Sequence, residues 1–152
     1  MTSALLHEHD GQRTFVVVLD TGDEVMTTLA TFASSQRLQA AQFTAIGALS
    51  RGVVAFFEWT TKQYRHIPID EQVEVLSIIG DISLDGDRPK VHAHAVLGKA
   101  DATAWGGHLV EGHVRPTLEI VITESPSHLR RRYDPESGLS LIDPSRPSRS
   151  RP

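Results

Sequence analysis

The sequence predicts an α+β domain, in which a mainly antiparallel sheet of about five to six strands carries one principal helix packed on a face. The chain has 152 residues, 39% hydrophobic and 22% charged, which is typical of a single globular domain. One segment repeats its apolar residues with the period of a helix. Six other segments are rich in β-branched and aromatic residues or alternate with a period of two, which favours strands.

The elements are expected in the following order. Thr14–Leu19 (TFVVVL) forms a strand, which the turn residues Asp20–Gly22 close. Asp23 can cap a helix over Glu24–Arg37, because the apolar residues of this segment recur near helical spacing. The stretch GALSRG (47–52) is expected as a tight turn between two strands. The strands expected after the helix are Ala41–Leu49, Gly52–Trp59, Val73–Ser83, Lys90–Leu97 and Pro116–Thr123.

Charge divides the chain into one domain over 1–127 and a basic Pro/Ser/Arg tail over 128–152. The formal net charge is −4, yet the tail holds six Arg against three acidic residues, so residues 1–127 carry −7 and the tail +3. The last ten residues, DPSRPSRSRP, are expected to be disordered, because they cannot bury enough apolar surface to offset the entropy of ordering. An electropositive groove for nucleic acid is not expected on the body.

No membrane or targeting signal is visible. The first ten residues, MTSALLHEHD, lack the basic start and apolar stretch of a signal peptide. Phe15–Leu19 and Val53–Phe57 are the longest apolar runs and have five residues each, against the roughly 20 that span a bilayer. We therefore expect a soluble, cytoplasmic protein with no membrane partner.

The histidines suggest a metal site. The chain has eight His and no Cys, so disulfides, thiolate metal sites and Cys nucleophiles are excluded. In KVHAHAVL (90–97), His92 and His94 lie two residues apart and share one face of a strand. His108 follows Gly106 and Gly107, which suit a loop that folds back over the strand and brings a third imidazole. The alternative is that these are ordinary polar histidines without a ligand.

Two other groups have ambiguous roles. Glu119 lies in the apolar segment PTLEIVIT (116–123), where it is either a general base or orienting carboxylate near the metal, or an edge-strand residue that faces solvent. Glu74 raises the same question with less support, and His113 is a weaker metal candidate than His108. Asp81 and Asp85, in GDISLDGD, are interpreted first as turn residues.

Several motifs taken together resemble the plant-and-prokaryote conserved (PPC) domain. They are GDIS (80–83), VHAHAVLG (91–98), GGHL (106–109) with Gly112, and PTLE (116–119), with IGALS (46–50) upstream. The resemblance covers about residues 12–124. It implies a compact domain, commonly a homotrimer, and in prokaryotic members a metal, zinc by expectation, on His92, His94 and His108. The AT-hook that precedes the domain in plant DNA-binding proteins is missing from the sequence.

Three functions are compatible with these patterns. The first is a homotrimeric, zinc-binding PPC-like domain of unestablished activity, with room for a small-molecule ligand near the metal. The second is a DNA-associated or protein-interaction module without catalysis, whose contact with nucleic acid depends on the basic tail. The third is a metal-dependent enzyme that uses water bound at the three histidines, with Glu119 as the catalytic carboxylate.

Overall fold

The computed structural model describes residues 1–125 and 129–145 as one helix and nine strands. The helix is α1 (Val25–Ser35), and it packs against β6 and β7. The strands are β1 (Thr2–His9), β2 (Gln12–Asp20), β3 (Ala40–Glu58), β4 (Gln63–Ile69), β5 (Val73–Asp85), β6 (Arg88–Gly98), β7 (Ala104–Glu124), β8 (Arg131–Asp134) and β9 (Leu139–Ile142).

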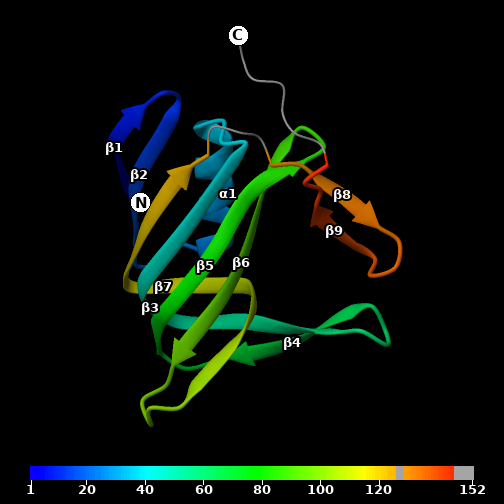
Figure 1. The fold of residues 1–152 in the computed structure, drawn as a ribbon. Coiled ribbons are helices and arrows are strands. Elements are labelled where there is room, and N and C mark those ends of the chain that lie inside the picture. Colours follow the sequence, from blue (N-terminus) through cyan, green and yellow to red (C-terminus); the bar gives the residue numbers. More distant parts are fainter. Residues whose placement is uncertain (126–128, 146–152) are drawn as a thin grey trace.

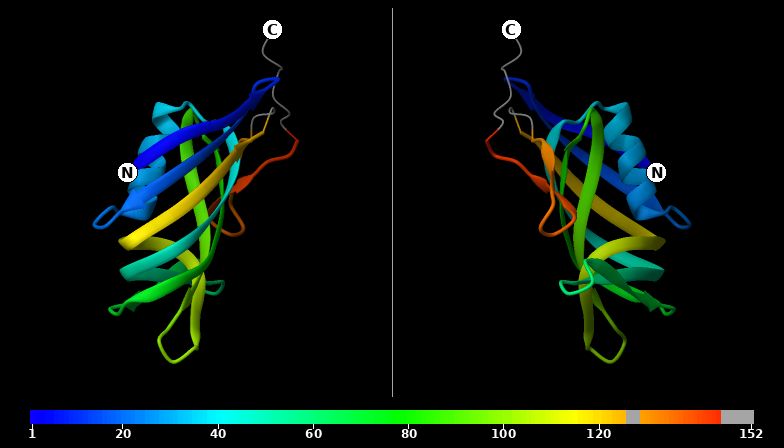
Figure 2. Two further views of the ribbon diagram at one scale, coloured as in Figure 1. Left: turned by 90° about the vertical axis from the view of Figure 1, so that its left-hand side faces the viewer. Right: turned by 90° about the vertical axis from the view of Figure 1, so that its right-hand side faces the viewer.

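Seven strands form one antiparallel sheet in the order β1-β2-β7-β6-β5-β3-β4 (Figure 1). The long strand β7 also pairs with β3, so β3, β5, β6 and β7 make a closed ring of hydrogen-bonded pairings. The hairpin β3–β4 projects sideways from this ring, and α1 lies beside the upper part of the sheet (Figures 1 and 2). The ring gives each of its four strands a partner on both sides over part of its length, which reduces the unpaired backbone groups that edge strands otherwise expose.

The predicted fold class was wrong in the number of strands and in the weight given to the helix. The sheet has seven strands rather than five to six, and the helix is a short element of 11 residues in a mostly β structure. β1 and β4 were missed because every residue of β1 is exposed and β4 is mostly polar, so neither shows the alternation that marks a half-buried strand. The first half of β7, Ala104–Arg115, was missed as well.

The expected turn at GALSRG (47–52) does not exist, because these residues lie inside β3. The register of β3 against its neighbours shifts here, between Ala45 and Gly47 on the β5 side and between Gly47 and Arg51 on the β7 side. Gly47 has φ +151°, and a Cβ at this position would lie 2.3 Å from the carbonyl oxygen of Thr117. The glycine therefore permits a bulge with very close approach of two strands, rather than a reversal of the chain.

The core lies between the inner faces of the strands and one side of α1. Alternate residues of β2, β3, β5, β6 and β7 are buried, and α1 adds Val25, Leu29, Phe32 and Ala33. Phe15 of β2 meets Phe32 edge to face, with ring centroids 5.4 Å apart. Fully buried large side chains on the strands include Leu19, Phe43, Leu49, Ile78, Leu97, Leu109, Leu118 and Ile120.

Glu24, rather than the expected Asp23, caps α1 and ties the helix to β7. Its carboxylate accepts hydrogen bonds from the amides of Met26 and Thr27 at 3.1 and 2.7 Å, and from the amide of Gly112 on β7 at 3.1 Å. Burial opposes ionisation of Glu24, but these hydrogen bonds outweigh it and lower the pKa of the carboxyl. Asp23 instead accepts from the amide of Asp20 in the preceding turn.

The segment 129–145, expected as tail, contains the hairpin β8–β9. The amide of Leu84 at the end of β5 donates to the carbonyl of Leu129 at 2.8 Å, which holds the start of this segment beside the sheet. The disorder expected for 143–152 falls mostly on 146–152, outside the described residues, while Asp143 is buried and donates its amide to Arg130. Within the described part of the chain, no helix has the length and apolar character to cross a membrane.

Replacing Glu24 with Ala is expected to lower the free energy of unfolding by about 1–2 kcal/mol, because three amides lose their acceptor. Urea denaturation measures this. Glu74→Ala, which removes an exposed carboxylate from β5, is the control and should change stability by less than about 0.5 kcal/mol. If both variants are equally stable, Glu24 does not join α1 to β7 energetically.

Candidate metal centre

Two of the expected metal ligands lie side by side on β6. His92 and His94 share a face of the strand, and their ring centroids are 5.2 Å apart. Ala93 and Ala95 point the other way into the core, where they are 1% and 3% exposed. His92 is partly buried and His94 exposed, so the pair stands at the border between the packed interior and solvent.

His108 completes a group of three imidazoles. It lies directly opposite His94 in the β6–β7 ladder, with ring centroids 5.4 Å from His94 and 5.1 Å from His92. The ligand nitrogens of all three residues lie within 4.8 Å of one another. The structure thus brings together the histidines that the sequence singled out.

His108 lies in a strand, whereas the sequence favoured a loop at this position. Gly106, Gly107 and His108 lie inside β7, which runs between β6 and β3 at this point. A Cβ on Gly107 would lie 2.8 Å from the carbonyl oxygen of Ala55 on β3. Glycine is therefore needed for close packing of backbones rather than for a tight turn.

Burial keeps two of the imidazoles in the neutral form that binds metals. Desolvation, with smaller contributions from the neighbouring His92 and His94, lowers the pKa of His108 to about 4. Desolvation also lowers the pKa of His94, with a smaller contribution from His92. Among the described residues, Nδ1 of His108 is buried without any hydrogen-bond partner. Such a nitrogen is costly to leave unpaired.

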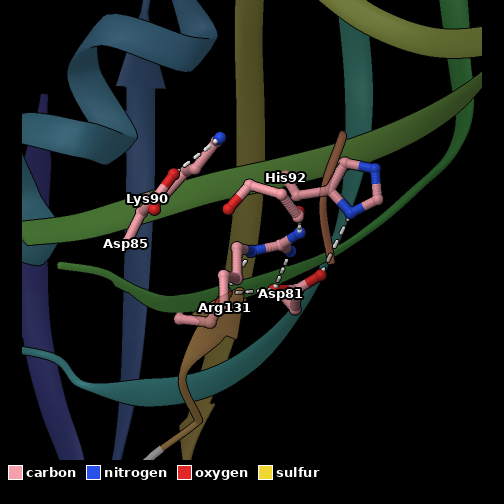
Figure 3. A network of polar contacts seen from close by, with 7 residues as sticks. Asp81, Asp85, Lys90, His92 and Arg131 are labelled. Atoms are coloured by element: carbon pink, nitrogen blue, oxygen red, sulfur yellow. Dashed lines mark hydrogen bonds and ion pairs between the residues drawn. The ribbon is translucent and has the colours of Figure 1, made fainter. Parts of the chain in front are cut away.

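Asp81, interpreted from the sequence as a turn residue, instead lies within β5 and contacts His92. Its Oδ2 is 3.1 Å from Nδ1 of His92, and its Oδ1 accepts from Arg131 and Ser83 (Figure 3). Burial disfavours the charged form, but the hydrogen bonds from His92, Arg131 and Ser83 prevail and lower the pKa of Asp81 to about 2. An ionised carboxylate only accepts, so Nδ1 of His92 carries the proton and leaves Nε2 free for a metal.

A signal for Asp81 was present in the sequence. The expected strands 73–83 and 90–97 flank the turn residues Asp85-Gly86-Asp87, and a hairpin folded there pairs residues by counting outward from the turn. Asp85 pairs with Arg88, and the same count puts Asp81 opposite His92, as the structure has it. His108 was not placed in this way, because Ala104–Arg115 was not expected as a strand, although the same count from the connection 99–103 puts it opposite His94.

An aromatic wall borders the histidines on the β3–β4 hairpin. Tyr64 of β4 stacks on His108, with ring centroids 4.7 Å apart, and Phe57 packs against Tyr64 and Trp59. On the other side, a hollow of about 540 Å³ adjoins His92 and His94. Its lining joins apolar Ile79 and Val121 to the polar side chains of Gln42, Thr44, Asp81 and Thr123.

The other site residues considered from the sequence, Glu119, Glu74 and His113, lie away from the three histidines. Glu119 is exposed on β7, where its partners across the sheet are Val18 and Ile46 rather than any residue of β6. Glu74 is exposed on β5, opposite Ala48 and Gly98. His113 contacts Glu111, and Arg51 lies 3.3 Å from its ring nitrogen. No described contact links any of these three side chains to the histidine group.

The acid dependence of stability should report the charge on Asp81. Because its pKa falls from the ordinary 3.8 to about 2, the ionised carboxylate stabilises the fold above pH of about 4, and this contribution is lost as the pH falls towards 2. We expect the stability difference between the wild type and Asp81→Asn to shrink by about 2 kcal/mol from pH 5 to pH 2, measured by urea denaturation. A difference that stays constant over this range would contradict the network.

Comparisons with known structures support one family. A metal-containing protein from Archaeoglobus fulgidus superposes with a TM-score of 0.79 at 30% identity, over 85% of this chain and 91% of that one. A plant- and prokaryote-conserved (PPC) protein from Pyrococcus horikoshii superposes with a TM-score of 0.81 at 30% identity, over 93% of this chain and 94% of that one. A protein from Bacteroides thetaiotaomicron, named as a candidate DNA-binding protein, superposes with a TM-score of 0.87 at 24% identity, over 95% of this chain and 99% of that one.

No curated protein matches the sequence. The family model of the Plants and Prokaryotes Conserved (PCC) domain matches residues 6–126, which include the histidine group and Asp81 but end before the hairpin β8–β9. The match covers most of the chain and confirms the resemblance drawn from the motifs. The chain therefore belongs to the Plants and Prokaryotes Conserved domain family.

Proposed function

We propose that this chain is a metal-binding domain that holds one divalent transition-metal ion, zinc by preference, on His92, His94 and His108. The observation that carries the proposal is the buried Nδ1 of His108, which has no hydrogen-bond partner among the described residues. This ring lies within 5.4 Å of two other imidazoles, so the unpaired nitrogen belongs to a group with suitable donors for one ion.

The chemistry of the donor set fits zinc. Neutral imidazoles are borderline donors that suit Zn²⁺, and the lowered pKa values of His94 and His108 reduce competition from protons. Three protein ligands leave one coordination position, which supplies Lewis-acid chemistry towards water or a carbonyl oxygen when the metal is bound. Tyr64 shields one side of His108, and the hollow beside His92, which has both apolar and polar lining residues, offers room for a small molecule. Glu119 has no part in this proposal.

Purified protein should contain zinc at about one ion per chain, since three imidazoles make one site. His92→Ala, His94→Ala or His108→Ala should remove most of it, measured by elemental analysis and by competition with a chromophoric chelator. His66→Ala is the matched control, because His66 is an exposed histidine on the neighbouring β4. Metal-free protein whose melting temperature does not respond to zinc would contradict the proposal.

The outer face of the sheet supports a second part of the proposal, association of the chain with itself as a homotrimer. Large apolar side chains on β3, β5, β6 and β7 remain between 44% and 64% exposed. They point away from the core on adjacent strands, and monomeric proteins rarely leave such a patch uncovered. The residues are Ile46, Leu76, Ile79, Val96 and Val121.

Ile46→Lys should convert the trimer to monomers, because its ammonium must be desolvated in an apolar interface, which costs several kcal/mol even beside Glu119. The new Lys would lie opposite Glu119 in the β3–β7 ladder, so the fold itself should tolerate it. Leu141→Lys, on β9, introduces the same change at an exposed apolar residue outside the patch and should leave the trimer intact. Sedimentation equilibrium measures both. A monomeric wild type, or a trimeric Ile46→Lys, would refute this interface.

DNA binding is not included in the proposal. The body carries −7, and four of its nine Lys and Arg side chains pair with carboxylates, in Arg13–Glu124, Arg65–Glu58, Lys90–Asp85 and Lys99–Glu71. The remaining support for the alternative is that structural neighbours are named as candidate DNA-binding proteins and that three Arg residues lie within 146–152, outside the described residues.

A further inference from the structure

Arg131, at the start of β8, is a buried charge beyond the residues that the family model matches. Its side chain is 6% exposed. The family match ends at residue 126, so the hairpin β8–β9 lies outside the residues that the family model covers. A guanidinium that is almost fully buried requires partners for its N–H groups, and the identity of those partners indicates its role.

The partners of Arg131 connect the hairpin to β5. One terminal nitrogen donates to Oδ1 of Asp81 at 2.7 Å, Nε donates to Oγ of Ser83 at 2.7 Å, and the other terminal nitrogen donates to the carbonyl of Ser140 at 2.8 Å. Figure 3 shows Arg131 reaching across to Asp81, whose other oxygen is aimed at the imidazole of His92. The ion pair Asp85–Lys90 lies next to this chain of contacts, and the charge of Arg131 also acts on Asp85.

These contacts give each oxygen of Asp81 a fixed task. Oδ1 accepts from Arg131 and from the hydroxyl of Ser83, at 2.7 and 2.9 Å. Oδ2 is left for Nδ1 of His92, at 3.1 Å. Rotation of the carboxylate would break the charge-assisted bond to Arg131, so the arginine restrains the oxygen that orients His92. The restraint fixes both the ring plane of His92 and the nitrogen that carries its proton.

We propose that Arg131 is a positioning residue for the metal centre, which acts through Asp81 to hold His92 with Nδ1 protonated and Nε2 directed at the ion. The inference rests on the proposed function, and it makes the C-terminal hairpin part of the metal site although no hairpin residue is a ligand. The competing explanation is that Arg131 only fastens the hairpin to the domain, as its bond to Ser140 does.

Two measurements on full-length Arg131→Gln separate these explanations. Zinc affinity, from competition with a chelator, should fall about tenfold or more, in line with the loss of an outer partner of a ligating histidine. In the metal-free protein, ¹⁵N chemical shifts of the imidazoles should show His92 changing from the Nδ1-protonated tautomer to a mixture. Arg132→Gln is the matched control, because Arg132 is the next hairpin residue and contacts Asp143 instead of Asp81.

An Arg131→Gln variant that matches Arg132→Gln in both zinc affinity and His92 tautomer would overturn the inference. If Arg131→Gln does not fold, Arg131→Lys replaces it. The ammonium keeps the charge but cannot reproduce the guanidinium fork, so both readouts should still shift, and unchanged readouts would equally refute the role. If the wild type binds no zinc, the proposed function fails on its own, while the tautomer comparison still decides whether Arg131 positions His92.

Discussion

The pairing of β7 with three other strands, β6, β3 and β2, is the constraint on which the rest of the structure depends. Over its 21 residues, β7 pairs with β6 near its beginning and with β3 and β2 further along, which closes the ring of strands around the core. Gly107 allows this because a side chain there would collide with the backbone of β3. The pairing of β7 with β6 sets His108 opposite His94, so the candidate metal centre is a consequence of the course of β7.

Partial burial disfavours the charged form of both kinds of ionisable group at this centre, yet His94 and His108 become neutral while Asp81 stays charged. For His94 and His108, desolvation is the largest influence and lowers the pKa, which favours the neutral imidazole. For Asp81, desolvation acts against ionisation but is outweighed by hydrogen bonds, which keep the carboxylate charged. The site therefore combines neutral donors with an adjacent fixed anion, a combination that suits a cation and specifies which nitrogen of His92 is free.

The location of the centre links metal binding to the outer surface of the domain. His94 and Ile79 are cross-strand partners, so the histidine group lies at the margin of the exposed apolar patch on β3, β5, β6 and β7. The hollow beside His92 is lined by residues of these same strands. Self-association through the patch would cover the open side of the hollow, and the metal, its outer partners and the interface would then share one region of the sheet.

The sequence by itself determined the family, the antiparallel character of the sheet, and His92 and His94 as neighbours on one strand face, because all of these follow from motifs or from the period of a strand. Counting back from the turn at Gly86 could also have placed Asp81 opposite His92. Only the tertiary structure decided the rest. β1 and β4 lack the alternation that local patterns require, β3 continues through Gly47 because of a contact with distant Thr117, and Arg131 reaches Asp81 across 50 residues of sequence. These features depend on long-range strand pairing and burial, whose energies no local window of sequence contains.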